Sequence, residues 1–417
     1  MKVALINPNW NKRKSSETTY NRTWIPLSLA YSASLLKGNN IKPLLIDAHA
    51  LNLCVDKIIE KVKDYDKIFI TTSPYDRWQC PDINIEPALK LFKALINKEC
   101  YVIGTHVTFN PEKILKLTKA KAGIIGSPEF SILGICKNKE LSKINNVVFL
   151  KGSKLIKTKK KPVNVNKLLL PAYDLFNPYK YEYEIFGKMF ALIETTRGCI
   201  YNCNFCYHKD MFGEYSEINI KKVIKFLKKL IKSGFRTAYF IDLNFLTNKN
   251  RVKKLCKEII RNKIRIKWCC QSRIDNLDGE TANLMKKAGC ELIHIGIENS
   301  SANIQKKIKK NININKTKEN IKLLKKNNIK FAYFILLGLG EKEEDIKKTK
   351  RFIKETKPDY ISVHHFQNFR LFKKRQVSLK EKLCKINLLM MNIYMIKLKD
   401  MIQNPFKKIK IFINSLR

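Results

Sequence analysis

The chain has 417 residues, enough for two or three domains, and its 45% hydrophobic content argues against wholesale disorder. Lys and Arg number 82 against 36 Asp and Glu, which gives a formal net charge of +46. Only 13 of the basic residues are Arg, the residue of bidentate phosphate and base recognition, and Lys is abundant from end to end. The charge is therefore interpreted as a drift in composition, and a nucleic-acid partner is not expected.

The first part of the chain alternates short apolar runs with amphipathic stretches. These patterns predict strands at residues 2–8, 42–48, 66–74, 100–106 and 122–129, and helices at residues 25–39, 86–98 and 111–120. Repeated βα units with apolar strands predict a doubly wound, Rossmann-like parallel sheet over residues 1–136. Ligands bind such sheets beyond the carboxyl ends of the strands. Those ends carry small and polar residues, among them Thr72, Ser73, Gly104, Thr105, His106 and Gly126.

Residues 137–187 are predicted to be a linker that contains a hairpin around Gly152. A second βα series follows, with strands predicted at residues 189–199, 235–245, 266–275, 291–300, 331–341 and 359–367. Six strands are too few for the eight of a closed TIM barrel. The α/β fold predicted for residues 188–370 is therefore a partial (β/α)6 TIM-like barrel, with its active face at the carboxyl ends of the strands.

Residues 371–417 are rich in Lys and Met and are predicted to form a helical C-terminal extension. Two interpretations stay open for it, packing on the barrel or peripheral contact with a membrane surface, where basic amphipathic helices can lie. The chain has no run of 18 apolar residues and no signal-peptide pattern. A cytoplasmic protein is expected.

Three of the twelve cysteines are clustered in the segment TTRGCIYNCNFCYH, as Cys199, Cys203 and Cys206. A C-x3-C-x2-C cluster in one short loop is typical of a metal site. With His208 as a fourth ligand, the set would make a Cys3His zinc site. Three thiolates alone instead suit a [4Fe-4S] cluster with one open iron, and the placement of all three in one loop after a strand favours this interpretation.

Several further elements follow in an order that resembles the radical S-adenosylmethionine (SAM) enzymes, over about residues 188–370. They are Phe205 before the last clustered cysteine, Asp242 and Asn244 after the second strand, the run Ser272-Arg273-Ile274-Asp275, the run Gly296-Ile297-Glu298, and Leu336, Gly338, Gly340 and Glu341. This resemblance implies that the three cysteines hold a [4Fe-4S] cluster. It also implies that Phe205, Asp242, Asn244, Ser272, Arg273, Glu298 and Gly338 bind SAM.

Some of these implied roles compete with a purely structural role. Glu298 is a candidate for the ribose hydroxyls, or it is an exposed residue at a strand end. Arg273 could pair with the SAM carboxylate, or it could form a salt bridge with Asp275 or Asp242. Phe205 could pack near the adenine, or it could belong to the core. Gly338 would let the backbone approach the adenine closely.

The N-terminal domain resembles the one that binds cobalamin in a subfamily of these enzymes. The resemblance implies cobalamin contacts at Thr72, Ser73, Gly104, Thr105, His106 and Gly126. The subfamily's D-x-H-x-x-G loop, which supplies an axial histidine, is absent after the first strand, and Asp47 and His49 imitate it only superficially. Many members lack that loop. The sequence QNFRLF also replaces the P-G-T element often found after the last strand.

The predicted function is reductive cleavage of SAM to a 5′-deoxyadenosyl radical, with cobalamin-dependent methylation of a small-molecule or lipid substrate. The alternatives are a cobalamin-independent radical SAM cyclase or oxidoreductase, a radical SAM tRNA-modifying enzyme, a zinc protein that binds nucleic acid, and an inactive relative. His364 and His365 close the last strand and are the candidates for contact with substrate. An electron donor such as flavodoxin or ferredoxin is the expected protein partner.

Overall fold

The computed structural model describes residues 1–10, 22–73 and 85–366, and single residues between Val377 and Leu388. Nearly all of the predicted C-terminal extension lies outside the described residues. The chain divides into two compact units. Among the described residues, the first comprises those within 1–193 and 207–236, and the second comprises those within 194–206 and 237–366. The four-part division expected from the sequence stays a prediction.

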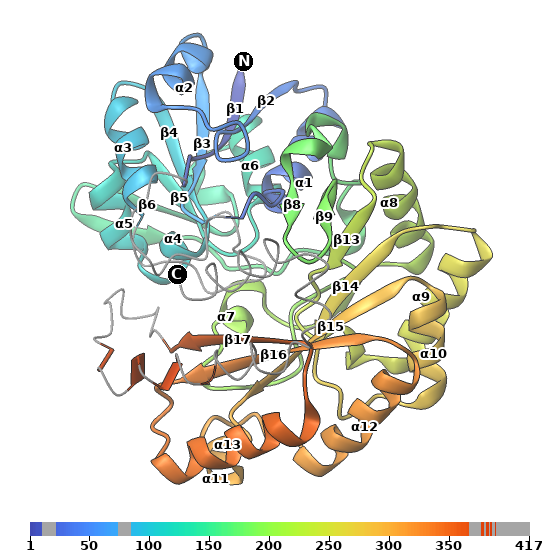
Figure 1. The fold of residues 1–417 in the computed structure, drawn as a ribbon. Coiled ribbons are helices and arrows are strands. Elements are labelled where there is room, and N and C mark those ends of the chain that lie inside the picture. The colour runs from blue at the N-terminus through green and yellow to red at the C-terminus, as the bar shows by residue number, and fades with distance from the viewer. Residues whose placement is uncertain are drawn as a thin grey trace. The chain divides into compact units, whose positions relative to one another are not determined.

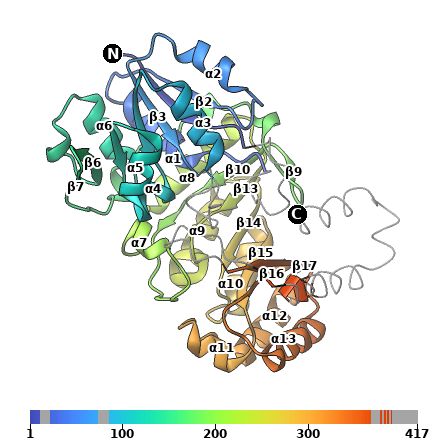
Figure 2. The same cartoon turned by 90° about the vertical axis from the view of Figure 1, so that its left-hand side faces the viewer.

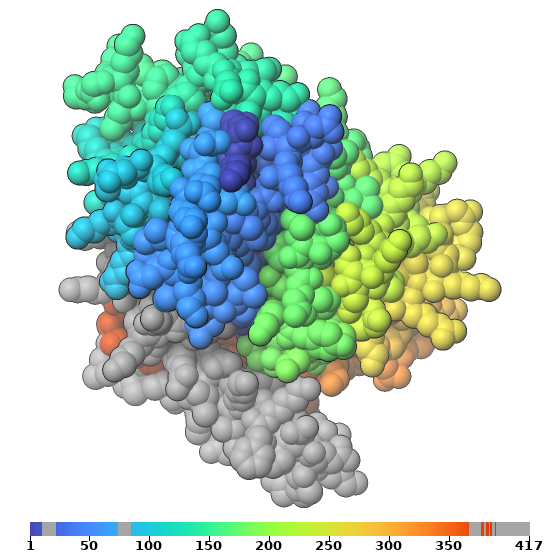
Figure 3. All heavy atoms as spheres, turned by 90° about the horizontal axis from the view of Figure 1, so that it is seen from above, coloured from blue at the N-terminus to red at the C-terminus, as the bar shows by residue number. Residues whose placement is uncertain are grey.

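A seven-stranded sheet forms the centre of the first unit (Figure 1). Its strand order is β2 (Pro43–Asp47), β1 (Val3–Asn7), β3 (Lys67–Thr71), β4 (Glu99–Ile103), β5 (Ala122–Ile124), β6 (Val147–Lys151) and β7 (Lys154–Lys157). The first five strands pair in parallel, and β6 and β7 add an antiparallel edge. The first residues of β1, dark blue in Figure 3, lie between other blue segments of the same unit, as an inner strand requires.

Alternate residues of these strands enter two separate hydrophobic cores, one on each face of the sheet. On one face Val3, Leu5 and Tyr101 pack with α1 (Leu27–Lys37) and α6 (Glu129–Cys136). On the other face Ala4 and Ile6 pack with α2 (Val55–Val62), α3 (Glu86–Ala94) and α5 (Pro111–Thr118). The doubly wound sheet predicted from the apolar strands is confirmed, because both faces of the sheet are covered by helices.

The hairpin predicted around Gly152 is also confirmed, with β6 paired to β7. The pairing of β6 with β5 adds this hairpin to the edge of the sheet. The unit also contains α4 (Thr105–Phe109), α7 (His208–Phe212) and α8 (Ile220–Lys232). A short 3-10 turn at Tyr173–Leu175 holds the buried Tyr173, whose hydroxyl donates to the carbonyl of Leu192 at 2.8 Å.

A six-stranded sheet has the order β10 (Phe190–Ile193), β13 (Thr237–Phe240), β14 (Lys267–Ser272), β15 (Cys290–Glu298), β16 (Lys330–Leu337) and β17 (Tyr360–His365). From β13 to β17 neighbouring strands are parallel. The helices between them are α9 (Lys249–Arg261), α10 (Gly279–Lys287), α11 (Ala302–Lys307), α12 (Ile314–Lys326) and α13 (Glu343–Thr356). Strand order follows chain order, as expected of the open (β/α)6 barrel.

Helices lie along one side of the strands of the second unit (Figure 2), and the side chains of these strands alternate between the helix side and the opposite face. On the helix side the Trp268 indole donates to the carbonyl of Ala288, just after α10, and Tyr333 packs against Phe352 of α13. On the opposite face the His294 ring is stacked between Tyr239 and Phe334, with centroid distances of 5.2 and 5.1 Å. This alternation follows from the two-residue period of a strand.

Candidate active site

The three clustered cysteines lie in a loop that begins where the chain leaves β10. Cys199, Cys203 and Cys206 are each partly buried, and the amide of Cys206 donates to the carbonyl of Cys203 at 3.1 Å. Burial raises the pKa of the Cys203 thiol, while the positive charges of Lys310 and Arg273 act in the opposite direction. The two cations thus offset part of the effect of burial on the Cys203 thiol, whose pKa stays above its usual value.

The start of this loop is fixed by Asp242, two residues after β13. Its Oδ1 accepts from the amides of Thr195 at 2.7 Å and Thr196 at 2.9 Å, and its Oδ2 accepts from the Thr195 hydroxyl. Asp242 is 1% exposed. Burial raises the pKa of Asp242 to about 6, against the hydrogen bonds from Thr195, which lower it. The structure thus places this expected SAM ligand under the cysteine loop, and its contact with SAM stays a prediction.

Glu194 and Arg197, on either side of Thr195 and Thr196, are also buried. Arg197 donates to Glu194 through Nε at 3.0 Å and through Nη2 at 2.8 Å, with both side chains less than 5% exposed. This bidentate pair fixes the two residues between its partners, Thr195 and Thr196, in one geometry. Gly198 follows with φ of 79°, a conformation that glycine adopts without strain, and it turns the chain toward Cys199.

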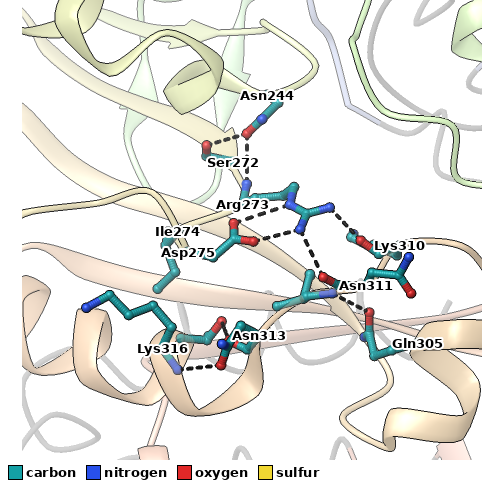
Figure 4. A network of polar contacts seen from close by, with 12 residues as sticks. Asn244, Ser272, Arg273, Ile274, Asp275, Gln305, Lys310, Asn311, Asn313 and Lys316 are labelled. Carbon is teal, nitrogen blue, oxygen red and sulfur yellow. Dashed lines mark hydrogen bonds and ion pairs between the residues drawn. The ribbon is translucent and has the colours of Figure 1, made fainter.

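The middle of the loop rests on Arg273, at the carboxyl end of β14. The Tyr201 ring lies over its guanidinium, with the central carbon 4.1 Å from the ring centroid. Figure 4 shows that the same guanidinium forms a two-point ion pair with Asp275 and reaches the carbonyls of Lys310, at 2.6 Å, and Asn311. Arg273 therefore forms the salt bridge that was the structural alternative, and its pairing with the SAM carboxylate stays a prediction.

Asn244 and Ser272 connect two neighbouring strand ends beside Arg273 (Figure 4). Asn244 Oδ1 accepts from the Ser272 hydroxyl at 2.6 Å and from the Arg273 amide at 2.9 Å. The Ser272 oxygen in turn accepts from the amide of Leu246 at 3.0 Å. Both side chains are buried, so their described contacts are structural, and any contact with SAM stays a prediction.

The last part of the loop is held by the end of α11. Asn204 donates through its amide to the carbonyl of Ile308 at 3.1 Å and through Nδ2 to the carbonyl of Lys307 at 2.8 Å. Carbonyls at a helix end lack partners within the helix, so they are available as acceptors. Phe205 packs against a small apolar cluster that contains Ile304 and Leu339. Sequence reasoning missed Asn204, Tyr201 and Lys310, because their contacts join distant segments and carry no local pattern.

Glu298 ends β15 in an unusual backbone conformation. Its φ is 61°, and the pairing register with β16 shifts between Gly296 and Glu298. The carboxylate is 9% exposed and accepts from the Lys310 ammonium at 2.6 Å. Lys310 Nζ also lies 5.7 Å from the centroid of the Phe205 ring. The expected ribose ligand is thus a buried partner of a lysine beside the cysteine loop.

The turn in the glycine-rich segment after β16 is closed by hydrogen bonds to the side chain of Glu341. The Glu341 carboxylate accepts from the amides of Gly338 and Leu339, both at 2.7 Å. Gly338 and Gly340 have φ of 84°, so both positions require glycine. The predicted close approach of Gly338 to adenine is not tested by these contacts, which show only that the turn is fixed.

The strand ends of the first unit gather the residues expected to contact cobalamin. His106 and Thr105 are fully buried, and His106 Nδ1 lies 3.0 Å from the Thr72 hydroxyl. Gly104 has φ of 111°, and an added Cβ would meet the Thr72 oxygen at 3.1 Å. Ser73 is also buried, and its amide donates to Thr71 Oγ1 at 3.2 Å. The predicted group is therefore assembled in space at adjacent ends of β3 and β4.

A pocket of about 260 Å³ lies at the end of β5 in the same unit. It is lined by Ile125, Gly126, Ser127, Asn146, Lys160, Lys161, Pro162, Met211, Phe212 and Gly213. Gly126 has φ of 68°, and an added Cβ would lie 2.8 Å from the carbonyl oxygen of Met211. The pocket places Gly126 beside a small cavity at the edge where doubly wound sheets bind ligands.

The histidines singled out in the sequence have different surroundings. His208 is buried, with its ring stacked on Tyr207 at 4.3 Å, and burial lowers the pKa of His208 to about 4. His364 is exposed and lies 2.7 Å from the Ser362 hydroxyl, while His365 is half-buried. His49 is buried with Nε2 3.0 Å from the carbonyl of Arg22. The roles expected for these side chains stay predictions.

The cysteine loop supplies three thiols in one short segment, a donor set that suits a [4Fe-4S] cluster with one open iron. Cys199 and Cys203 are close enough to influence one another's charge. Among the described residues, however, no three His, Cys, Asp or Glu side chains are gathered as a ready metal site. The loop therefore suits the cluster because it supplies three thiols and is held in place at several points, although the thiols are not already gathered around one metal position.

Residues 193–353 match the family model described as the Radical SAM superfamily. The chain carries a radical SAM domain. The match begins at the end of β10 and includes the cysteine loop, α9 to α12 and most of α13. The superfamily inferred from the order of short elements is confirmed.

Two curated relatives extend the likeness over 86% of this chain. An uncharacterized methyltransferase of Pyrococcus horikoshii is 28% identical and covered over 79% of its length. An anaerobic magnesium-protoporphyrin IX monomethyl ester cyclase of Cereibacter sphaeroides is 24% identical and covered over 60% of its length. Both likenesses include the N-terminal unit as well as the radical SAM domain.

Two solved structures share the fold. The radical SAM methyltransferase TsrM from Kitasatospora setae, solved with cobalamin and a [4Fe-4S] cluster, has a TM-score of 0.70 at 15% identity over 87% of this chain and 72% of that one. The cobalamin-dependent radical enzyme OxsB has a TM-score of 0.69 at 16% identity over 89% of this chain and 54% of that one. These likenesses confirm the predicted fold class. Within the described residues, no helix has the length and apolarity needed to cross a membrane.

Proposed function

We propose that this chain is a cobalamin-dependent radical SAM methyltransferase that acts on a small-molecule substrate. The observation that carries the proposal is the combination of a three-thiol loop with a fold that matches TsrM and OxsB over both units. A methyltransferase-named relative covered over most of its length points the same way.

In this proposal Cys199, Cys203 and Cys206 hold a [4Fe-4S] cluster. When reduced and bound to SAM, such a cluster supplies a 5′-deoxyadenosyl radical. The chain's part is to deliver three thiolates in one geometry. Lys310 and Arg273 assist, because their positive charges stabilise thiolate over thiol at Cys203.

SAM would lie against the carboxyl ends of the strands of the second unit. Glu298, held at the bulge of β15, offers a carboxylate for the ribose hydroxyls, a pairing also found in dinucleotide-binding folds. Gly338 offers backbone without a side chain after β16. The Lys310 ammonium is held by Glu298, so a cation is also present for the carboxylate of SAM.

Cobalamin would be held by the first unit, along Thr72, Ser73, Gly104, Thr105, His106 and Gly126. His106 is fully buried and bonded to Thr72, so we assign it to support of the strand ends and not to axial ligation. The pocket beside Gly126 provides space for part of a large ligand. This arrangement would bind cobalamin without a histidine ligand from the D-x-H-x-x-G loop.

The substrate would meet the non-helical face of the second unit. Phe334, Ser362 and His364 occupy this face of β16 and β17, and the register pairs Phe334 with Ser362. Phe334 is half-buried and His364 is exposed. An aromatic ring beside a hydroxyl and an imidazole suits a substrate with both apolar and polar parts.

The test is anaerobic purification, reconstitution with iron and sulfide, and incubation with hydroxocobalamin, followed by SAM carrying a deuterated methyl group and a reductant. The proposal predicts iron–sulfur and corrinoid absorption, 5′-deoxyadenosine, and loss of the labelled methyl from SAM. Cys203→Ala is the matched control that should abolish 5′-deoxyadenosine. Formation of 5′-deoxyadenosine without any corrinoid binding would contradict the cobalamin part and leave a cobalamin-independent radical enzyme.

A further inference from the structure

A buried polar cluster of Thr195, Asp242 and Arg251 lies at the start of the cysteine loop. We propose that Asp242 and Arg251 are positioning residues, which hold Cys199 in place through Thr195, and that Asp242 does not bind SAM. The inference rests on the proposed function, because the position that matters is that of a cluster ligand. It reassigns a residue that the family resemblance places among the SAM contacts.

Asp242 uses both of its oxygens on the loop. Oδ1 accepts two consecutive amides, those of Thr195 and Thr196, and Oδ2 accepts the Thr195 hydroxyl. These amides lie just beyond the end of β10, and Thr196 begins the two-residue strand β11 (Thr196–Arg197). Three of the roughly four acceptor sites of this carboxylate thus serve buried donors of the loop, and Asp242 is 1% exposed, which leaves little access for a ligand ammonium.

Arg251 closes the cluster from the first turn of α9. Its guanidinium donates to the carbonyl of Thr195 at 3.0 Å and to the Thr195 hydroxyl oxygen at 3.2 Å. The Thr195 hydroxyl donates its hydrogen bond to Asp242, and its oxygen accepts the hydrogen bond from Arg251. Thr195 is thereby bonded through its amide, hydroxyl and carbonyl, and its side chain joins a buried anion to a buried cation.

The anchor acts on Cys199 through a short and mostly rigid segment. The chain from Thr195 to Arg197 is further fixed by the buried pair of Arg197 and Glu194. One glycine, Gly198, then separates this segment from Cys199. A shift at Thr195 therefore moves the first cluster ligand, while Asn204 holds the distal part of the loop independently.

Three variants separate anchoring from SAM binding. Thr195→Val removes the hydroxyl but leaves both backbone bonds to Asp242, and Thr195→Ser restores the hydroxyl. Asp242→Asn keeps the shape but loses the charge. Asp359→Asn is the matched control, because Asp359 also accepts a backbone amide, that of Phe331 at 3.0 Å, at the opposite ends of the strands.

Two measurements read the result. Hydrogen exchange of the protein without cluster should speed up about tenfold in the peptide covering residues 194–199 for Thr195→Val and Asp242→Asn, and stay near wild type for Thr195→Ser and Asp359→Asn. Iron bound per chain after reconstitution should fall by about half or more in the first two variants. The dissociation constant for SAM, measured on the loaded fraction, should change by less than about twofold.

Two results would overturn the inference. Unchanged exchange and iron content with SAM binding weakened about tenfold would make Asp242 a SAM ligand. If Asp359→Asn and Asp242→Asn changed hydrogen exchange in this peptide equally, the polar cluster of Thr195, Asp242 and Arg251 would contribute only to the overall stability of the fold. If wild type binds no iron, the proposed function fails, whereas the exchange measurement still decides whether the anchor exists.

Discussion

The Tyr201 ring covers the guanidinium of Arg273 at 4.1 Å, so a residue between two of the clustered cysteines is stacked on the end of β14. Lys could not replace Arg here, because the planar fork also meets both oxygens of Asp275 and the carbonyl of Lys310. The contact explains how residues 199–206, which form neither helix nor strand, keep a fixed position.

Arg273→Lys should therefore lower the free energy of unfolding of the second unit by about 2 kcal/mol or more, because it removes a two-point ion pair and leaves Asp275 half-buried. Urea unfolding followed by fluorescence measures the change. Arg261→Lys is the control, since Arg261 is 75% exposed in its pair with Glu258, and it should cost less than about 0.5 kcal/mol. Equal costs for both variants would argue against the stacked anchor.

The ion pair of Glu298 and Lys310 should show strong coupling. Both side chains are close to 10% exposed, so removal of one partner leaves a buried charge. We expect Lys310→Met to cost about 3 kcal/mol and the double variant with Glu298→Gln to cost less than the sum of the single variants. The exposed pair Lys316 and Glu319 is the reference cycle, with coupling below about 0.5 kcal/mol. Additive costs at positions 298 and 310 would contradict the pairing.

Asp47 should make a larger contribution to the free energy of unfolding at acid pH than at neutral pH. Burial raises the pKa of Asp47 to about 6, although Tyr181 and Asn7 donate to it and lower it. The folded state thus holds a proton more tightly than the unfolded chain, whose Asp pKa is about 4. The contribution of Asp47 to stability is full below about pH 4 and declines as the pH rises to about 6, by about 2 kcal/mol.

Asp47→Asn resembles the protonated acid and lacks this decline. The variant should therefore lose less stability relative to wild type at pH 7 than at pH 4.5, as urea unfolding at the two pH values would measure. Comparison with wild type at each pH cancels other titrating groups, including His208, whose lowered pKa acts in the opposite direction. A difference that grows with pH would contradict the sign of the Asp47 shift.

Gly126 should tolerate no side chain. Its φ of 68° penalises any L-residue, and a Cβ would lie 2.8 Å from the Met211 carbonyl oxygen. We expect Gly126→Ala to cost about 2 kcal/mol or more and to weaken hydroxocobalamin binding. Gly152→Ala is the matched control, because Gly152 has φ of 60° with open space around it, and it should cost about 1 kcal/mol. Both costs follow from thermal unfolding, and equal costs would argue against the crowding at Met211.

The sequence predicts both sheets because apolar strands and amphipathic helices can be recognised from the local spacing of their apolar residues. It also places the polar residues at strand ends, since parallel strands share one edge. It does not predict that Asp242 lies under Thr195, or that Lys310 pairs with Glu298. Those contacts depend on how loops return over the sheet, and Lys310 stands in a Lys-rich run where no lysine is distinctive. The hairpin at Gly152 can be predicted from the residues around the turn, but the pairing of its first strand with β5 cannot.

Iron content and low-temperature EPR of the anaerobically reconstituted chain, before and after SAM, test the central claim most directly. The account predicts about four irons per chain, a reduced [4Fe-4S] signal that changes on addition of SAM, and loss of both in Cys203→Ala. A colourless protein that binds one zinc and shows no iron signal would contradict it.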